Sequence, residues 1–278
     1  MNSLGTIKKY CITKETPLGY MISDGKHEYF LHRNETAYQT LNIGTEVDAF
    51  IYLDKKLRPA ATLHRPLITL DAFAFVPVVS VLANTGVFVD IGISRDILVS
   101  SDYLPKESRY WPHPGDHLLC KLKVKADRLL ARPLSKEEVL AAGKTDLLTG
   151  TVAAYVFAIH PKGILLITES YQLIYVYTGA YRKYCRLGEK AEVKITGETE
   201  IGYRGAFAEN GISKNKELIL AYLRKHQGVM TITEKSSPDI IKRLFNISKK
   251  NFKETLGRLY KDKAIEILPD KIILTDKK

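Results

Sequence analysis

The sequence predicts a mainly β protein with an α-helical C-terminus: three tandem five-stranded barrels of the oligonucleotide-binding type, followed by a winged-helix domain. The first observation is a repeat, because the same order of strand and turn signals recurs three times at a period of about 60–70 residues. The second is the size of that repeat. Five short strands suit a small closed barrel, whereas a sandwich needs about seven strands and about 100 residues. The third is a change after residue 212, where helical spacing replaces strand alternation.

Four domains follow from this pattern, at residues 1–64, 65–134, 135–212 and 213–278. Each of the first three contains a strand in which apolar and polar residues alternate, which indicates one buried face. A glycine precedes each of these strands by three residues and suits a tight turn with positive φ. The strands begin at Val47, Leu118 and Ala191, and the glycines are Gly44, Gly115 and Gly188.

Residues 72–89 form an uncharged stretch of 18 residues that could be mistaken for a membrane helix. Pro77 and the turn-forming Asn84-Thr85-Gly86 interrupt it, and a spanning helix needs about 20 continuous apolar residues. The stretch therefore predicts two buried strands around a turn, and we expect no membrane partner.

A short helix is predicted between the second and third barrels. Ser135 and Glu138 have the spacing of a capping box, and Gly143 is a stop signal.

The C-terminal domain shows the signals of three helices and a hairpin. Ser213, Ser237 and Ser248 are predicted N-caps, and Pro238 occupies a first helical position. Pro269-Asp270 lies between two short alternating runs and predicts a hairpin turn. Three helices and a hairpin within one small domain are typical of a winged helix.

The charge distribution favours an anionic partner. The chain has 42 Lys and Arg against 31 Asp and Glu, a net charge of +11. Residues 213–278 hold 16 of these cations and eight acids, whereas residues 136–212 hold nine of each. Such a balance favours nucleic acid, with the C-terminal domain as the main source of electrostatic attraction.

Several kinds of chemistry find no support in the sequence. The three cysteines are far apart and lack a CxxC spacing, which excludes a disulfide framework or thiolate zinc site and fits a reducing cytoplasm. The chain shows no catalytic Ser/His/Asp order, phosphate-cradling glycine loop or carboxylate cluster. We therefore expect no enzyme activity, cofactor, metal or small-molecule substrate.

The second repeat, through NTGVFVDIG, DILVSSDYL and PGDHLLCKLKVKADRLL, resembles the S1 RNA-binding domain. Three such repeats followed by SSPDIIKRLFNISKKNFKETLGRLYKDKAIEI resemble, over nearly the full chain, the bacterial conserved virulence factor B family. The resemblance implies three S1 domains and a winged helix in a cytoplasmic, non-enzymatic protein. It further implies single-stranded RNA as the partner and a role in post-transcriptional regulation of genes, including virulence genes.

The resemblance also suggests which residues contact RNA. The S1 pattern places an aromatic residue two positions after a turn glycine; Phe88 matches it, and Tyr20 stands one position early in the first repeat. The histidine of the third strand is matched by His32. The basic residue of the closing strand is matched by Lys56 and Arg128. We expect rings to stack on bases and cations to meet phosphates.

The third repeat departs most from the pattern. Val176 stands where the first repeat has His32 and the second has Ser100, and no ring follows Gly163. We therefore do not expect this barrel to bind RNA through the same face. Residues 175–186 interleave tyrosines with Arg and Lys, which suits either a nucleic-acid contact or packing against a neighbouring domain.

In the winged helix, four cations begin or lie along the predicted recognition helix: Lys249, Lys250, Lys253 and Arg258. A capped basic helix suits phosphates or a groove. Two alternatives to the RNA-binding hypothesis stay open. The protein could be a transcription regulator that binds duplex DNA through its winged helix, or an accessory subunit of a ribosome or ribonuclease assembly.

Overall fold

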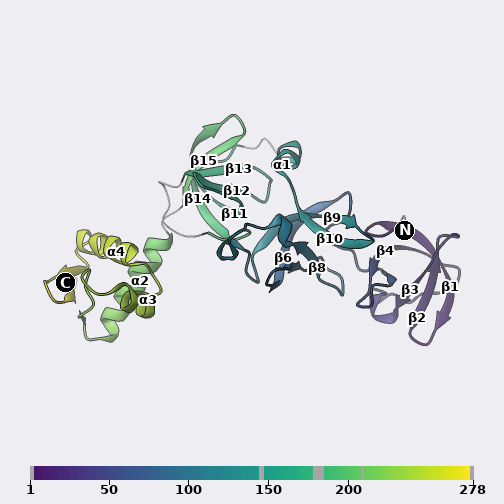
Figure 1. Cartoon of the computed structure of the whole chain (residues 1–278), viewed down its shortest axis with the longest axis horizontal. Helices are drawn as coiled ribbons and strands as arrows, with labels where there is room; N and C mark the ends of the chain where they lie inside the picture. The colour runs from purple at the N-terminus through teal and green to yellow at the C-terminus, as the bar shows by residue number, and fades with distance from the viewer. Residues whose placement is uncertain (1–2, 144–146, 178–184, 208–209, 276–278) are drawn as a thin grey trace. The chain divides into compact units, whose positions relative to one another are not determined.

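The computed structural model of the chain describes residues 3–143, 147–177, 185–207 and 210–275 (Figure 1). The chain divides into two compact units, residues 1–206 and residues 207–278. The first unit is built from β-barrels and the second from three helices with a small sheet. The predicted fold class is confirmed.

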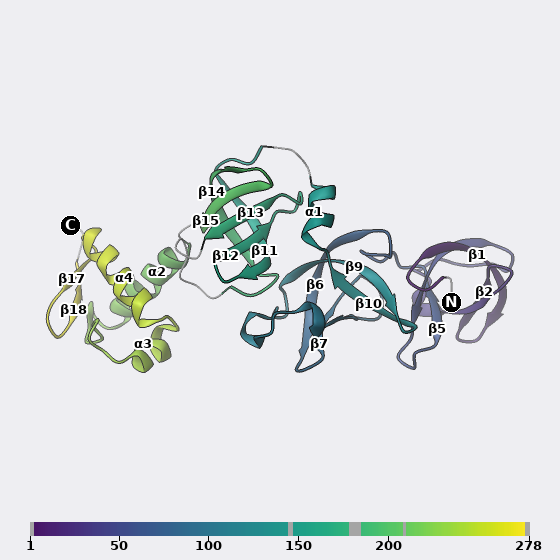
Figure 2. The same cartoon turned by 45° about the horizontal axis from the view of Figure 1, so that its top comes forward.

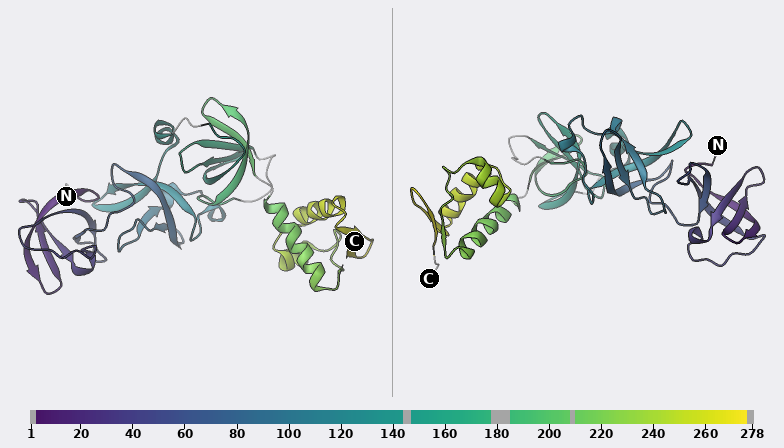
Figure 3. Two further views of the ribbon diagram at one scale, coloured as in Figure 1. Left: turned by 180° about the vertical axis from the view of Figure 1, so that it is seen from behind. Right: turned by 60° about the horizontal axis from the view of Figure 1, so that its bottom comes forward.

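Three closed five-stranded barrels make up the first unit, and Figure 3 shows them from two further directions. In each barrel the third strand pairs in parallel with the fifth, whereas the first strand pairs antiparallel with the second and the fourth, and the second pairs antiparallel with the third. Barrel 1 comprises β1 (Ile7–Thr16), β2 (Gly19–Ser23), β3 (Glu28–His32), β4 (Glu46–Leu53) and β5 (Pro59–Thr62). Barrel 2 comprises β6 (Phe73–Leu82), β7 (Gly86–Val89), β8 (Ile97–Ser100), β9 (His117–Lys125) and β10 (Arg128–Pro133). Barrel 3 comprises β11 (Thr151–His160), β12 (Gly163–Ile167), β13 (Leu173–Tyr177), β14 (Lys190–Thr199) and β15 (Gly202–Phe207).

The glycines before the alternating strands have the predicted backbone. Gly44, Gly115 and Gly188 adopt φ values of +86°, +92° and +77°, a region that side chains disfavour. The glycine that begins β7 has a different role. A Cβ on Gly86 would lie 2.0 Å from the Val99 carbonyl oxygen, so only glycine lets β7 approach β8 this closely.

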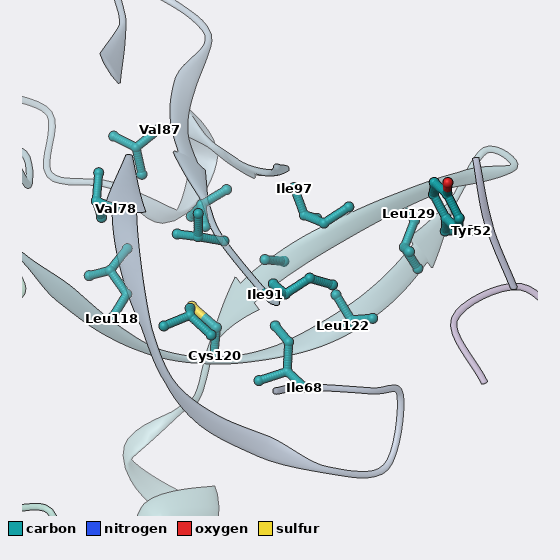
Figure 4. Close-up of a cluster of buried hydrophobic side chains, with 14 of the residues drawn as sticks. Tyr52, Ile68, Val78, Val87, Ile91, Ile97, Leu118, Cys120, Leu122 and Leu129 are labelled. Atoms are coloured by element: carbon teal, nitrogen blue, oxygen red, sulfur yellow. The ribbon is translucent and has the colours of Figure 1, made fainter. Parts of the chain in front are cut away.

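The uncharged stretch forms two strands around a turn, as predicted. It contains the whole of β6 and β7, and valines from both strands point into the core of barrel 2 (Figure 4). Among the helices that the structure describes, none is both long enough and apolar enough to cross a membrane.

Barrel 1 packs against barrel 2 through the outer face of β4. Phe50 and Tyr52 face away from their own barrel, yet both are buried because they join the hydrophobic cluster of barrel 2. Figure 4 shows Tyr52 beside Leu129 at one end of that cluster. The Tyr52 hydroxyl also lies 3.3 Å from the Ser94 hydroxyl. This packing explains why the apolar pattern of β4 is nearly continuous.

Barrels 2 and 3 meet through rings and an ion pair. The Phe75 and Tyr155 rings lie 4.6 Å apart between centroids. The buried Asp116 carboxylate accepts two hydrogen bonds from the Arg186 guanidinium, at 3.1 and 3.2 Å. The backbones also join, because the His117 N–H donates to the Gly188 carbonyl at 2.9 Å.

The linking helix α1 (Lys136–Ala142) has the predicted capping box between Ser135 and Glu138 and ends at Gly143. The Glu138 carboxylate also accepts two hydrogen bonds from Arg132, at 2.7 and 2.6 Å, and pairs with Lys121 at 2.7 Å. These bonds, with that from the Ser135 backbone, hold the pKa of Glu138 far below its usual value.

The second unit is a winged helix. Its helices are α2 (Asn210–Lys225), α3 (Pro238–Phe245) and α4 (Lys249–Lys261) (Figure 2). Its sheet has the order β16 (Val229–Met230), β18 (Ile272–Leu274), β17 (Ile265–Ile267). The predicted caps Ser237 and Ser248 are confirmed. The prediction for Ser213 is wrong, because α2 begins three residues earlier. The core includes Phe252, Leu256 and Leu259 of α4.

Candidate nucleic-acid interface

The outer face of β7 and β8 presents the Phe88 ring in barrel 2. Phe88 is half-buried and lies opposite Leu98, while Gly86 lies opposite Ser100. Side chains on a strand alternate between faces, so a ring two positions after the turn glycine points out of the barrel. Arg128 begins β10, which runs parallel to β8, and its side chain is exposed. A ring and a cation therefore lie on one side of this barrel.

Tyr20 does not occupy the equivalent position in barrel 1. It follows Gly19 directly, and a shift of one residue turns a side chain to the opposite face. The ring is 7% exposed within the core, and the Arg33 guanidinium lies 5.4 Å from its centroid. The Tyr20 ring therefore lies in the core of barrel 1 and offers no open face on which a base could stack.

Barrel 1 carries its outward ring on β3 instead. Phe30 lies opposite Met21, which corresponds to Phe88 in barrel 2 by strand register. Phe30 and His32 point to the same face, with ring centroids 6.2 Å apart in an edge-on arrangement. The His32 Nδ1 accepts a hydrogen bond from the Asn34 N–H at 3.1 Å. Sequence reasoning found His32 but missed Phe30, although its place two residues before His32 was a usable signal.

The basic position of the closing strand also needs correction in barrel 1. Lys56 is exposed in the turn between β4 and β5, before β5 begins. Leu31 pairs with Ala61 as Val99 pairs with Ala131, which makes Arg58 the counterpart of Arg128. Arg58 binds the Asp54 carboxylate at 2.8 and 2.6 Å.

The matching face of barrel 3 packs against barrel 2 and α1. Leu165, the counterpart of Phe88, is buried in a hydrophobic cluster that contains Leu119 of barrel 2 and Val139 of α1. The counterpart of His32 is Tyr177 rather than Val176, because Gly163 lies opposite Tyr177.

The exposed part of this face is small. Tyr175 packs against the cluster, whereas Tyr177 is 56% exposed, and their ring centroids are 4.7 Å apart. In the aromatic and basic run, Arg186 bonds to Asp116, so it contributes to domain packing. Tyr181, Arg182, Lys183 and Tyr184 lie outside the described residues.

In the winged helix, the four predicted cations of α4 fall into two pairs. Lys253 pairs with Glu234 at 3.2 Å, and Arg258 with Glu254 at 3.4 Å. Within the described part of the chain, Lys249 and Lys250 have no ion-pair partner. Both occupy the first turn of α4, which contains no acid. A helix N-terminus carries positive partial charge, so two lysines there favour binding of an anion.

Comparison with known proteins relates the domains to named families. Residues 4–64 match the S1 domain, residues 73–132 the CvfB first S1-like domain, and residues 217–274 the CvfB-like winged helix domain. Conserved virulence factor B of Staphylococcus aureus (strain bovine RF122 / ET3-1) is 33% identical over 246 residues, which cover 85% of this chain and 82% of that protein. The chain belongs to the conserved virulence factor B family.

Two further relatives extend the comparison beyond staphylococci. The uncharacterized protein YitL of Bacillus subtilis (strain 168) is 33% identical over 260 residues, covering 90% of this chain and 87% of that protein. A solved structure from Streptococcus pneumoniae, described as a multidomain protein with nucleic acid binding domains, aligns with a TM-score of 0.66 and 27% identity over 99% of both chains. The S1 and winged-helix domains of this family member indicate that it binds nucleic acid.

The outward residues could act on a nucleic acid by stacking and by charge. The described ranges contain no group of three or more His, Cys, Asp or Glu residues that could hold a metal ion. The domains are of types that bind nucleic acids.

Proposed function

We propose that the protein is a non-enzymatic, single-stranded-RNA-binding regulator of gene expression that works in the bacterial cytoplasm. Binding is an equilibrium in which outward rings of barrels 1 and 2 stack on bases. Cations of the barrels and of the winged helix meet the phosphates.

The observation that carries the proposal is an outward ring in each of barrels 1 and 2, on the second strand of barrel 2 and on the facing third strand of barrel 1. Phe88 of β7 and Phe30 of β3 are half-buried, so each keeps part of its ring surface accessible. Base stacking on an aromatic ring contributes about 1–3 kcal/mol and requires a base that is not in a duplex stack. Such rings favour a single strand over a duplex.

The charges support the same partner. Lys249 and Lys250 place positive side chains at the N-terminus of α4, which itself carries positive partial charge. A bound phosphate would reduce the repulsion between these charges. Arg128 supplies an exposed cation beside the face that carries Phe88.

Two further observations support the regulatory and cytoplasmic parts of the proposal. Named relatives are called virulence factors, which fits a protein that changes the expression of other genes. Cys11, Cys120 and Cys185 are all free thiols, as expected in a reducing compartment. Burial raises the pKa of the Cys120 thiol, which makes that thiol unreactive.

We expect single-stranded RNA to bind more tightly than duplex DNA of equal length at the same salt concentration, because the rings need unpaired bases. Fluorescence anisotropy with labelled oligonucleotides of matched sequence measures both affinities. Tighter binding of the duplex would contradict the proposal and favour the transcription-regulator alternative.

Phe88→Ala should weaken RNA binding by about 1–3 kcal/mol, the contribution of one stacked base, with little effect on folding. The comparison variant is Tyr20→Ala. That ring lies in the core, so its loss should lower the free energy of unfolding by about 3–5 kcal/mol. Anisotropy titrations and urea melts of both variants test the pair. A Phe88→Ala protein that loses stability but binds RNA normally when folded would show that Phe88 is a core residue.

A further inference from the structure

The hairpin of β9 and β10 carries a row of cations on its outer face. Lys121, Lys123 and Lys125 alternate along β9 with Leu122, which is buried in barrel 2, and with Val124, so the three lysines share the outer face of the strand. On β10, Arg128 lies opposite Lys125, and Arg132 lies opposite Lys121. We call these five residues the basic strip.

Only one end of the basic strip is neutralised. Glu138 of α1 pairs with Lys121 and Arg132, at 2.7 and 2.6 Å. Lys123, Lys125 and Arg128 are exposed, and within the residues that the structure describes none of them has an ion-pair partner. Like charges directly opposite each other in an antiparallel pair destabilise a sheet, so repulsion between Lys125 and Arg128 lowers the stability of this hairpin.

The other two barrels do not carry this row. Counted from the glycine that precedes each strand, the counterparts of Lys121, Lys123 and Lys125 in barrel 1 are Phe50, Tyr52 and Asp54. In barrel 3 they are Lys194, Thr196 and Glu198. Two of the barrel 1 residues pack against barrel 2, and the third binds Arg58. The row of three lysines is therefore not a requirement of the barrel fold.

The position of the basic strip connects it with the ring-bearing face. Arg128 belongs to both, because β10 pairs with β9 on one side and with β8 on the other. The other end of the strip stops at Glu138, beside the cluster in which barrel 2 meets α1 and barrel 3. A strand bound near Phe88 can thus continue past Arg128 onto Lys125 and Lys123.

We infer that the basic strip is a phosphate-binding track that extends the RNA site of barrel 2 around the outside of β9. This inference rests on the proposed function. Lys123, Lys125 and Arg128 bind successive backbone phosphates, and Glu138 ends the track by occupying Lys121 and Arg132. A single strand has phosphates along its whole length, so the track reads no sequence.

The test is the variant Lys123→Gln/Lys125→Gln in the full chain. Loss of two phosphate contacts should make the slope of log affinity against log salt shallower by about 1.4, at roughly 0.7 per phosphate on a single strand. The control variant is Lys26→Gln/Lys106→Gln, which removes the same charge from two exposed loop lysines. The probe is a labelled single-stranded RNA of about 30 nucleotides, longer than the roughly 4–16 nucleotides of one such barrel.

The thermal midpoint of the strip variant should stay equal or rise, because like-charge repulsion is removed. A shallower slope in this variant alone supports the track. The same slope in the strip variant, the control and the parent protein would overturn it, and so would a loss of affinity at unchanged slope. A parent protein that does not bind the probe would instead refute the proposed function.

Discussion

Removal of residues 210–278 should weaken RNA binding and make the slope of log affinity against log salt shallower by about 2–3. This change corresponds to the loss of three to four phosphate contacts on a single strand, each of which releases counterions. The reason is the distribution of charge. Residues 213–278 hold 16 cations and eight acids, a net charge of +8, whereas the preceding 212 residues carry +3. Within the residues that the structure describes, Lys249 and Lys250 in the first turn of α4 have no ion-pair partner. Anisotropy titrations over a range of salt concentrations measure the slope.

Lys249→Gln/Lys250→Gln in the full chain provides the matched comparison and should reproduce about 1.4 units of the change. Deletion of barrel 1 would be a poor comparison, because Phe50 and Tyr52 complete the cluster of barrel 2. A truncated protein that folds and keeps the parent slope would limit RNA recognition to the barrels.

Asp116→Ala should lower the free energy of unfolding of the first unit by about 2–4 kcal/mol, which is below the full cost of breaking a buried pair because Glu189 remains beside Arg186. The Asp116 carboxylate accepts bonds from Arg186 and from the His113 N–H, so its loss leaves partly buried donors without an acceptor. The single tryptophan reports the change. Trp111 packs against the core of barrel 2, and Tyr110 beside it accepts a backbone bond from Leu187 of barrel 3.

Glu107→Ala is the matched control for this experiment. Glu107 pairs with Arg109 at 2.6 Å in the same barrel, but both side chains are more than half exposed. Exposed pairs contribute about 0–1 kcal/mol. Urea melts followed by tryptophan fluorescence should therefore separate the two variants, and equal midpoints would show that the Asp116–Arg186 pair does not couple barrels 2 and 3.

Local signals in the sequence predicted much of the fold. Capping depends on residues three apart, so Ser135, Ser237 and Ser248 were correctly identified without knowledge of tertiary contacts. The turn glycines were also predicted correctly, because a tight turn with positive φ depends on the residues next to it in the sequence. The predicted start of α2 was too late along the chain. The short strand β16 was missed because a strand of two residues has no periodic pattern.

The candidate site was less predictable because it depends on the pairing between strands. His32 lies 13 residues after the glycine it faces, whereas Tyr177 and Ser100 lie 14 residues after theirs. The spacing of the first repeat, applied to Gly163, therefore predicts Val176, which points inward. The connecting turn in barrel 3 is one residue longer, so the residue that faces Gly163 is Tyr177. The Asp116–Arg186 pair joins residues 70 apart, and no spacing rule reveals such a contact.

The way each barrel uses its outer surface bears on how such an array can evolve. Barrel 1 gives Phe50 and Tyr52 to barrel 2, and barrel 2 gives Phe75 and Leu119 to barrel 3. A duplicated or transplanted barrel would present these apolar side chains to water, where a contiguous patch promotes aggregation. The three barrels are therefore not interchangeable modules. New copies could join the array only together with complementary changes in their neighbours, which favours a fixed number and order of barrels in this lineage.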